Sequence, residues 1–295
     1  MEIQTRSAIS WTLQGFVALL TASLFFMISL PAKKETAPAM RPEKEMEILL
    51  PQPTEVESLP YTPPSLRVES LPALEPVAPS VISHGSRERK FVALTFDACS
   101  TLRPSHYDER ITKTLIETHT PATLFLGGKW IEEDTAQTRY LASLQQFELA
   151  NHTFLHPHLL KVSDERVRQE LQWTQEAMYS VTGRQATLFR PPYGEYDDRI
   201  VRIAAEMGLT TIQYDLASGD PDPHISKEKL IEYVSSMAKN GSIIVMHINK
   251  GGWHTAEALP EIISGLRKRG FTFVTVSEMI ALSAPSAREN EKARN

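Results

Sequence analysis

Two histidines four residues apart give the clearest chemical signal in the sequence. His152 and His156 follow a short apolar run and are closed off by Pro157. If this spacing falls on a single helical turn, both imidazoles face one way and can bind one cation. The alternative interpretation is a pair of polar loop histidines without a ligand. Because other titratable residues occupy comparable positions in the chain, we favour a metal site.

Asp97 also ends an apolar run, where a carboxylate is costly to bury unless it has a partner or a chemical task. It can act as a metal ligand, as a general base or as a cap for the next helix. Arg190 follows a different apolar run and is the expected partner. A guanidinium lowers the pKa of a neighbouring carboxylate and fixes its direction.

His247 ends the apolar run 243–246, and two interpretations fit it. It can be a core histidine that is hydrogen-bonded to the backbone, or an acid that protonates a leaving group. Asp220 could hold its imidazole in the tautomer that the second role needs. Cys99 stands two residues from Asp97, so a cysteine nucleophile with His152 or His247 as its base must also be considered. No glycine-rich elbow surrounds Cys99, and a small buried thiol is the favoured interpretation.

Short apolar runs and amphipathic stretches alternate from Arg89 onward, which predicts parallel strands covered by helices on both faces. The predicted strands are 90–96, 122–126, 147–151, 188–190, 210–214, 242–246 and 271–276. The clearest predicted helices are 163–182 and 226–240. The pattern indicates one α/β domain, either a barrel or an open sheet. In such folds the carboxyl ends of the strands meet at one rim, so the residues named above are expected to gather there.

The N-terminal part of the chain has a different character. Residues 9–30 carry no charge and are long enough to cross a bilayer, so residues 1–32 are expected to be an uncleaved signal anchor, with a cleaved signal peptide as the alternative. Eleven of the twenty prolines lie between residues 31 and 79, which predicts a Pro-rich linker without fixed structure over 33–88. The folded domain is then expected over 89–283, with a polar tail at 284–295.

Charge and cysteine content exclude several classes of function. The net charge is −5 with an isoelectric point near 6.0, which argues against a nucleic-acid partner because phosphates require a basic surface. The single cysteine excludes an internal disulfide framework and a cysteine-rich zinc site.

Five short motifs follow one another at the predicted strand ends, and together they resemble the polysaccharide deacetylases of carbohydrate esterase family 4, the NodB-homology domain. The motifs are TFDAC at 95–99, HTFLHP at 152–157, RPPYG at 190–194, SGDPD at 218–222 and VMH at 245–247. The resemblance covers roughly residues 90–281. It implies an α/β fold, an irregular (β/α) barrel of about seven strands, and removal of acetyl groups from N-acetylated sugars.

The resemblance also implies a role for each motif residue. Asp97 would be the general base, and His247 the general acid, tuned by Asp220. His152 and His156 would bind a divalent metal, for which zinc is expected and cobalt, nickel or manganese are alternatives. Arg190 would orient Asp97. The region of Tyr193 would supply an oxyanion donor.

Two departures from the family pattern affect the expected chemistry. The family usually has Asp-Asp where this chain has Asp97-Ala98, and the second Asp completes the metal site. The fourth motif usually ends in Asp-Trp, whereas Asp220 is followed here by Pro221. A methyl group cannot coordinate a metal, so the third protein ligand is uncertain. Candidate substitutes are Cys99, Asp108, Asp220 and Asp222, and water could also fill the place.

The sequence therefore predicts a metal-dependent hydrolase that removes N-acetyl groups from an envelope or extracellular polysaccharide. Its partners would be the acetylated polysaccharide and, through the N-terminal segment, a membrane. The domain would lie outside the cytoplasm, either anchored or secreted. The alternatives are a catalytically degenerate carbohydrate-binding domain on the same fold and a polysaccharide O-acetyl esterase.

Overall fold

The computed structural model describes residues 64–100, 105–249 and 251–283, all of which belong to one compact unit. The predicted anchor at 1–32, the first part of the predicted linker and the predicted tail at 284–295 lie outside the described residues. In the described part of the chain, no helix combines the length and the apolar character needed to cross a membrane.

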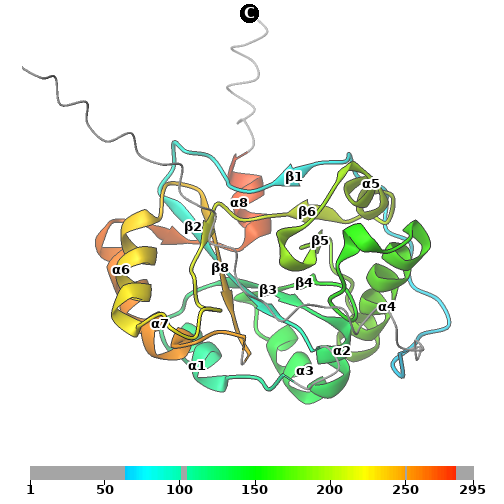
Figure 1. Ribbon diagram of the computed structural model, residues 1–295, viewed down its shortest axis with the longest axis horizontal. Helices are drawn as coiled ribbons and strands as arrows, with labels where there is room; N and C mark the ends of the chain where they lie inside the picture. Colours follow the sequence, from blue (N-terminus) through cyan, green and yellow to red (C-terminus); the bar gives the residue numbers. More distant parts are fainter. Residues whose placement is uncertain (1–63, 101–104, 250, 284–295) are drawn as a thin grey trace, which may run out of the picture. The chain divides into compact units, whose positions relative to one another are not determined.

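A sheet of nine parallel strands forms the centre of the described chain (Figure 1). The strands are β1 (Val81–Ile82), β2 (Phe91–Ala98), β3 (Ala122–Leu126), β4 (Phe147–Asn151), β5 (Leu188–Phe189), β6 (Thr210–Ile212), β7 (Leu216–Ala217), β8 (Ser242–His247) and β9 (Thr272–Phe273). Their order is β1-β6-β5-β4-β3-β2-β8-β7, and β9 pairs with β2. The predicted strands 122–126 and 147–151 are confirmed with their bounds.

The sheet curls because one stretch of chain pairs with strands on both sides of the barrel. Residues 210–212 form β6 beside β5, and a few residues later 216–217 form β7 beside β8. A second stretch of chain does the same near the start of β8. Its residues 81–82 form β1 beside β6, and His84, two residues later, forms a bridge with Ser242 of β8. The predicted parallel α/β fold is therefore confirmed, and the curled sheet fits an irregular barrel.

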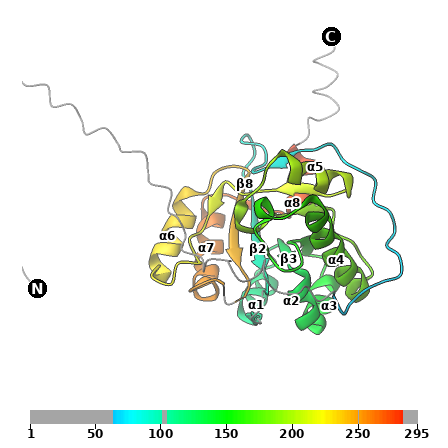
Figure 2. The same cartoon turned by 45° about the vertical axis from the view of Figure 1, so that its right-hand side comes forward.

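The structure describes eight α-helices and two short 3-10 turns. The helices are α1 (Glu109–Glu117), α2 (Gly128–Glu133), α3 (Thr135–Ser143), α4 (Asp164–Thr182), α5 (Asp198–Glu206), α6 (Lys227–Met237), α7 (Thr255–Lys268) and α8 (Val276–Ser283), and the 3-10 turns are η1 (Leu159–Lys161) and η2 (Pro192–Gly194). Helices α1 to α7 lie outside the curled sheet (Figures 1 and 2), whereas α8 packs on the apolar cluster inside it. The predicted helix 163–182 is confirmed: Ser163 caps it and Gly183 ends it in a left-handed conformation. The predicted helix 226–240 ends earlier, at Met237.

Side chains of β2 alternate between two apolar layers, which explains why its sequence is almost continuously hydrophobic. Leu94, Phe96 and Ala98 belong to the cluster between sheet and helices, whereas Ala93 belongs to the cluster inside the curled sheet. The same alternation turns Asp97 toward the inside of the barrel mouth, where it lines a pocket.

Residues 64–88 do not behave as the unstructured linker that the proline content predicts. Arg67 forms an ion pair with Glu176 of α4 at 2.9 Å, and the backbone N–H of Val77 donates to Ala205 of α5 at 3.0 Å. The segment then forms β1. Figure 2 shows it running along the outside of the domain past α4 and α5. Proline removes backbone donors but does not prevent an extended segment from docking through side chains and a few hydrogen bonds.

Candidate active site

A pocket of about 100 Å³ opens at the carboxyl ends of the strands, and all seven residues that the sequence singled out for catalysis or metal binding line it. They are Asp97, His152, His156, Arg190, Tyr193, Asp220 and His247. The strands and the loops that follow them deliver these side chains from distant parts of the sequence. The geometric expectation that parallel strand ends bring the motifs to one rim is therefore confirmed.

Asp97 and Arg190 form a buried ion pair at the floor of this pocket. Arg190 Nη1 donates to Asp97 Oδ1 at 2.7 Å, and both side chains are almost fully buried. Burial raises the pKa of Asp97, but the charge of Arg190, together with His152 and His247, outweighs burial and leaves the pKa below its ordinary value. Asp97 is therefore ionised across the physiological range.

The Arg190 guanidinium is held by aromatic faces as well as by the carboxylate. Its carbon lies 3.9 Å from the centre of the Phe125 ring and 5.7 Å from that of Tyr214. Among the described residues, its Nε and Nη2 atoms have no hydrogen-bond partner although they are buried. Unpaired buried donors are costly, and the contacts of the guanidinium with Asp97, Phe125 and Tyr214 offset part of that cost.

His152 and His156 lie on the loop after β4, and the prediction that they share a helical turn is wrong. Thr153 and His156 both have left-handed backbone angles, with φ of 62° and 57°. The two imidazoles nevertheless approach each other, with ring centres 4.9 Å apart. The strained left-handed residues of the loop bring the two imidazoles together, as four-residue spacing on a helix would also do.

Hydrogen bonding and burial keep both imidazoles in the form that binds metals. His152 Nδ1 donates to the carbonyl oxygen of Arg190 at 2.9 Å, which leaves the lone pair of Nε2 free. Burial lowers the pKa of His152, although Asp97 opposes it, and lowers the pKa of His156 well below its ordinary value. Neutral imidazoles are the donors that a divalent cation requires, so this pair fits such an ion.

Glu170 of α4 holds the histidine loop, and sequence reasoning did not identify it. Its carboxylate is fully buried and accepts hydrogen bonds from the backbone N–H groups of Phe154 and Leu155, both at 2.7 Å. Arg166 pairs with its other oxygen. A signal was present in the sequence, because Glu170 interrupts the apolar stripe that Val167 and Leu171 form on α4.

His247 and Asp220 form the second charged pair of the pocket. Asp220 Oδ1 accepts a hydrogen bond from His247 Nδ1 at 2.9 Å, and Oδ2 accepts one from the backbone N–H of His247 at 2.8 Å. Burial lowers the pKa of His247, but Asp220, with help from Asp97, outweighs burial and leaves the pKa above its ordinary value. The other ring nitrogen of His247, Nε2, is not bonded to Asp220 and can donate a proton to a group in the pocket.

None of the four proposed substitutes for the missing ligand is free to replace it. Asp220 also accepts hydrogen bonds from Ser218 and Thr255, so both its oxygens are engaged. Asp108 caps α1 and pairs with Arg110, and neither it nor Asp222 lines the pocket. Cys99 is also absent from the lining, and burial, with the charge of Asp97, raises the pKa of its thiol to about 12.

The two histidines are therefore the candidate metal donors that the pocket offers. Ala98 is fully buried in the cluster between sheet and helices and offers no ligand. Within the ranges that the structure describes, no group of three or more His, Cys, Asp and Glu side chains has the arrangement of a metal site. The carboxylate beside the histidines is that of Asp97, whose Oδ2 lies 3.7 Å from His152 Nε2.

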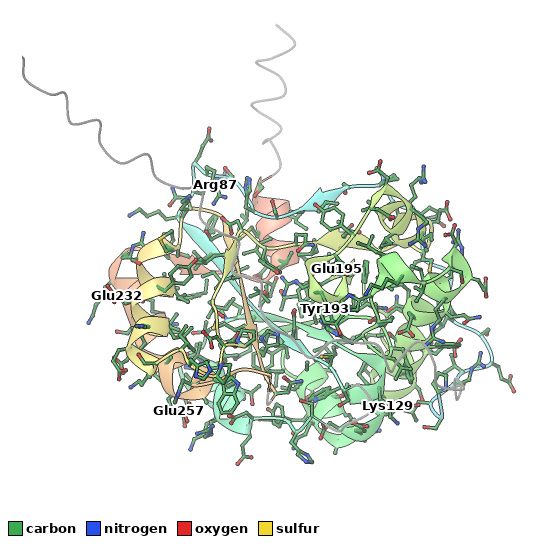
Figure 3. All side chains as sticks on the ribbon, in the orientation of Figure 1. Arg87, Lys129, Tyr193, Glu195, Glu232 and Glu257 are labelled. Carbon is green, nitrogen blue, oxygen red and sulfur yellow. The ribbon has the colours of Figure 1, made fainter. Side chains whose placement is uncertain are left out.

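Tyr193 stands between two histidines on the other wall of the pocket. Its ring meets His156 edge-on at 4.5 Å and stacks on His158 at 4.1 Å, so it separates His158 from the pair formed by His152 and His156. His158 Nδ1 contacts Glu195 at 2.7 Å, and Figure 3 shows Tyr193 and Glu195 side by side. Tyr193 has a left-handed φ of 59°. The stacked His158 and its partner Glu195, which the motifs did not reveal, support that strained turn.

Comparison with known proteins identifies the family. The sequence model described as polysaccharide deacetylase matches residues 84–212, a span that contains Asp97, His152, His156, Arg190 and Tyr193. The chain belongs to the polysaccharide deacetylase family. A bifunctional xylanase/deacetylase from Pseudobutyrivibrio xylanivorans is 32% identical over 197 residues, which make up 67% of this chain and 31% of that protein. A peptidoglycan-N-acetylglucosamine deacetylase from Bacillus cereus is 29% identical over 201 residues, or 68% of this chain and 71% of that protein.

A solved structure of this family raises the question of activity. A CE4 family pseudoenzyme from Bacillus anthracis superposes with a TM-score of 0.63 at 27% identity, covering 69% of each chain. A mutant of the same pseudoenzyme is described as having restored enzymatic activity. The polysaccharide deacetylase fold thus includes a pseudoenzyme. Whether this protein is catalytically active depends on the residues of its site.

Proposed function

We propose that the protein hydrolyses N-acetyl groups on an envelope polysaccharide, of peptidoglycan type or another N-acetylglucosamine polymer. The observation that carries this proposal is the pair of oppositely tuned groups in one pocket. The pKa of Asp97 lies below its ordinary value and that of His247 lies above it. These shifts favour an ionised base and a protonated acid, which is the starting state that amide hydrolysis requires.

In the proposed reaction, Asp97 accepts a proton from the water that attacks the acetamide carbonyl carbon. Arg190 holds the carboxylate in its orientation through the 2.7 Å hydrogen bond to Oδ1. As the C–N bond breaks, His247 donates a proton to the departing nitrogen, and Asp220 keeps Nδ1 of that imidazole protonated. The products are acetate and the free amine of the sugar. A backbone N–H in the Tyr193 turn is the proposed donor to the tetrahedral oxyanion.

His152 and His156 are the residues that would hold a divalent cation, for which we propose zinc. When bound, such an ion supplies a Lewis acid that polarises the acetamide carbonyl. The contribution of the protein is to keep both imidazoles neutral and to orient His152 through the carbonyl oxygen of Arg190.

Ala98 favours a second candidate function, a carbohydrate-binding domain without catalysis. The residue removes a negatively charged ligand from the metal site, and the family includes the Bacillus anthracis pseudoenzyme. We prefer the hydrolase because the base, the acid and their partners Arg190 and Asp220 are all present and in contact. A binding domain has no need for such pairs.

Acetate release from purified peptidoglycan tests the proposal, with a panel of other acetylated glycans as comparison. The full-length protein is assayed with and without added zinc, beside Asp97→Asn. Zinc-dependent acetate release that disappears in Asp97→Asn supports the hydrolase. Glycan binding without acetate release from any member of the panel would favour the second candidate.

For the location, we propose that residues 9–30 anchor the protein in a membrane with the domain outside the cytoplasm. The support is the uncharged run itself, which has the length of a membrane-spanning helix. This arrangement would bring the pocket close to envelope polysaccharides.

A further inference from the structure

A second, larger groove lies near the catalytic pocket, between the start of α1, the end of α2 and the loop that joins β8 to α7. Its volume is about 810 Å³, within the range of roughly 300–1,000 Å³ that is usual for small-molecule sites. The residues used below are Trp253, Gln137, Asp134 and His106, all of which line it. The ion pair between Arg110 of α1 and Glu257 of α7, at 2.8 Å, ties two of its bordering helices together (Figure 3 labels Glu257).

The groove presents an exposed indole and polar side chains that make no hydrogen bond within the described part of the chain. Trp253 is 49% exposed, which is unusual for so large an apolar ring. In the described part of the chain, the side chains of Gln137, Asp134 and His106 make no hydrogen bond, although His106 is close enough to Asp134 to act on its charge. A flat ring flanked by free donors and acceptors is suited to a sugar, whose C–H face packs on the ring while its hydroxyls bind the polar groups.

The groove and the catalytic pocket share a wall. The backbone N–H of Trp253 donates to the carbonyl oxygen of Asp220 at 2.6 Å, and Asp220 lines the catalytic pocket. Between them the chain passes through Gly251 and Gly252. A Cβ on Gly252 would lie 2.6 Å from Asp220 Oδ2, and one on Gly251 would lie 3.2 Å from the His247 ring. The ridge that separates the two sites thus carries no side chains at these positions.

The size of the catalytic pocket requires a site of this kind. About 100 Å³ accommodates an acetamido group but not a chain of sugars. If the substrate is a polymer, the sugars next to the reacting one must lie on the surface around the pocket.

We propose that the groove at Trp253 is a sugar-binding subsite, which binds a neighbouring residue of the polysaccharide while the acetylated sugar occupies the catalytic pocket. The indole packs on the sugar ring, and Gln137 and Asp134 bind its hydroxyls. This inference rests on the proposed polysaccharide substrate but not on catalysis, because a binding domain would use the same subsite.

The test measures how affinity depends on the length of the sugar chain. Oligosaccharides of one to six N-acetylglucosamine residues are titrated calorimetrically into the full-length protein, into Trp253→Ala and into Gln137→Ala. We expect the wild type to bind longer chains more tightly and Trp253→Ala to lose about tenfold in affinity for them, with a smaller loss for Gln137→Ala. Trp253→Phe should recover part of the loss. Tyr233→Ala, which removes an exposed ring from α6, is the matched control and should bind as the wild type does.

Each outcome decides the subsite separately from the hydrolase. If Trp253→Ala binds all lengths as the wild type does, or weakens the single sugar as much as the hexamer, the subsite is disproved. Length-dependent binding that needs Trp253, without acetate release, would uphold the subsite and overturn the hydrolase. Acetate release together with binding that does not depend on Trp253 would support the hydrolase and disprove the subsite.

Discussion

Asp220 binds His247 twice, through the imidazole Nδ1 at 2.9 Å and through the backbone N–H at 2.8 Å. One carboxylate thus fixes both the ring and the end of the strand that carries it. Because Ser218 and Thr255 occupy its remaining acceptor positions, Asp220 cannot turn toward a metal. We propose that its charge favours the protonated form of the His247 imidazole.

Asp220→Asn should move the alkaline limb of the pH–activity profile to lower pH. The proposed acid His247 is competent below its pKa, which Asp220 raises against the effect of burial. Removing the negative charge lowers that pKa, so activity is lost earlier as the pH rises. The measurement is kcat/KM against pH. Asp222→Asn changes the same loop outside the pocket and should leave the profile as it is. An unshifted limb in Asp220→Asn would show that His247 is not the titrating acid.

Asp97→Asn should remove most of the turnover, about 10²–10⁴-fold, while the fold and the bound zinc are retained. The amide oxygen can still accept the hydrogen bond from Arg190, so the side chain keeps its place. The base is competent above its pKa, which Arg190 and the nearby histidines lower, so the acidic limb of the wild-type profile should lie at low pH. The remaining activity of the variant should lack this acidic limb. The zinc content of the purified variant is measured as well. If Asp97→Asn loses zinc, Asp97 is a metal ligand and its proposed role as the base is wrong.

The strand ends could be predicted from the sequence because parallel strands buried on both faces have continuous apolar runs. β3 and β4 were predicted with their bounds for this reason. β1 and β7 are two residues each, too short to show any period, and they were missed. The predicted strand 271–276 contains β9 but runs into α8, which begins at Val276. Residues 64–88 were misjudged because composition does not report the individual contacts that hold an extended segment.

The residues of the site and two of the contacts between them could be predicted, but the loop conformations and the other contacts that hold them could not. Left-handed angles at Thr153, His156 and Tyr193 are rare for residues with a Cβ, and no local pattern announces them. The four hydrogen bonds to Asp220 and the clamp by Glu170 depend on contacts between distant parts of the chain. Sequence reasoning therefore identified the candidate acid, base and metal donors and two of their partners, Arg190 and Asp220, but it missed Glu170 and the left-handed turns.

Glu170→Gln should loosen the histidine loop. Glu170 accepts two backbone N–H groups through one oxygen and Arg166 through the other. A glutamine can replace only one of these acceptors and turns an amide donor toward either the loop or Arg166. We expect a loss of about 1–3 kcal/mol in the free energy of unfolding, together with weaker zinc binding. Urea denaturation and zinc titration measure the two effects. Glu165→Gln, on the exposed side of α4, is the control, and a Glu170→Gln protein that matched it would contradict the clamp.

The proposed membrane anchor predicts that the full-length protein sediments with membranes. Leu20→Arg places a charge in the middle of the uncharged run, at a cost of about 2.5–3.5 kcal/mol for a membrane-spanning helix, and should shift the protein toward the soluble fraction. Leu160→Arg, at an exposed position of the domain, should not. Fractionation followed by N-terminal sequencing gives the answer. A soluble mature form that begins near Lys33 would replace the anchor with a cleaved signal peptide.

Ala98→Asp should tighten zinc binding about tenfold or more, because His152 and His156 contribute no negative charge to offset a divalent cation. Ala98→Asn adds nearly the same volume without the charge and is the matched control. The carboxylate has a cost, since Ala98 is fully buried in an apolar cluster, so Ala98→Asp should also melt at a lower temperature without metal. Zinc titration of both variants, the wild type, His152→Ala and His156→Ala tests this. If Ala98→Asp binds no better than Ala98→Asn, the strand end cannot present a ligand. If the histidine variants bind as the wild type does, or the wild type binds no zinc, the metal-dependent hydrolase fails and the carbohydrate-binding candidate replaces it.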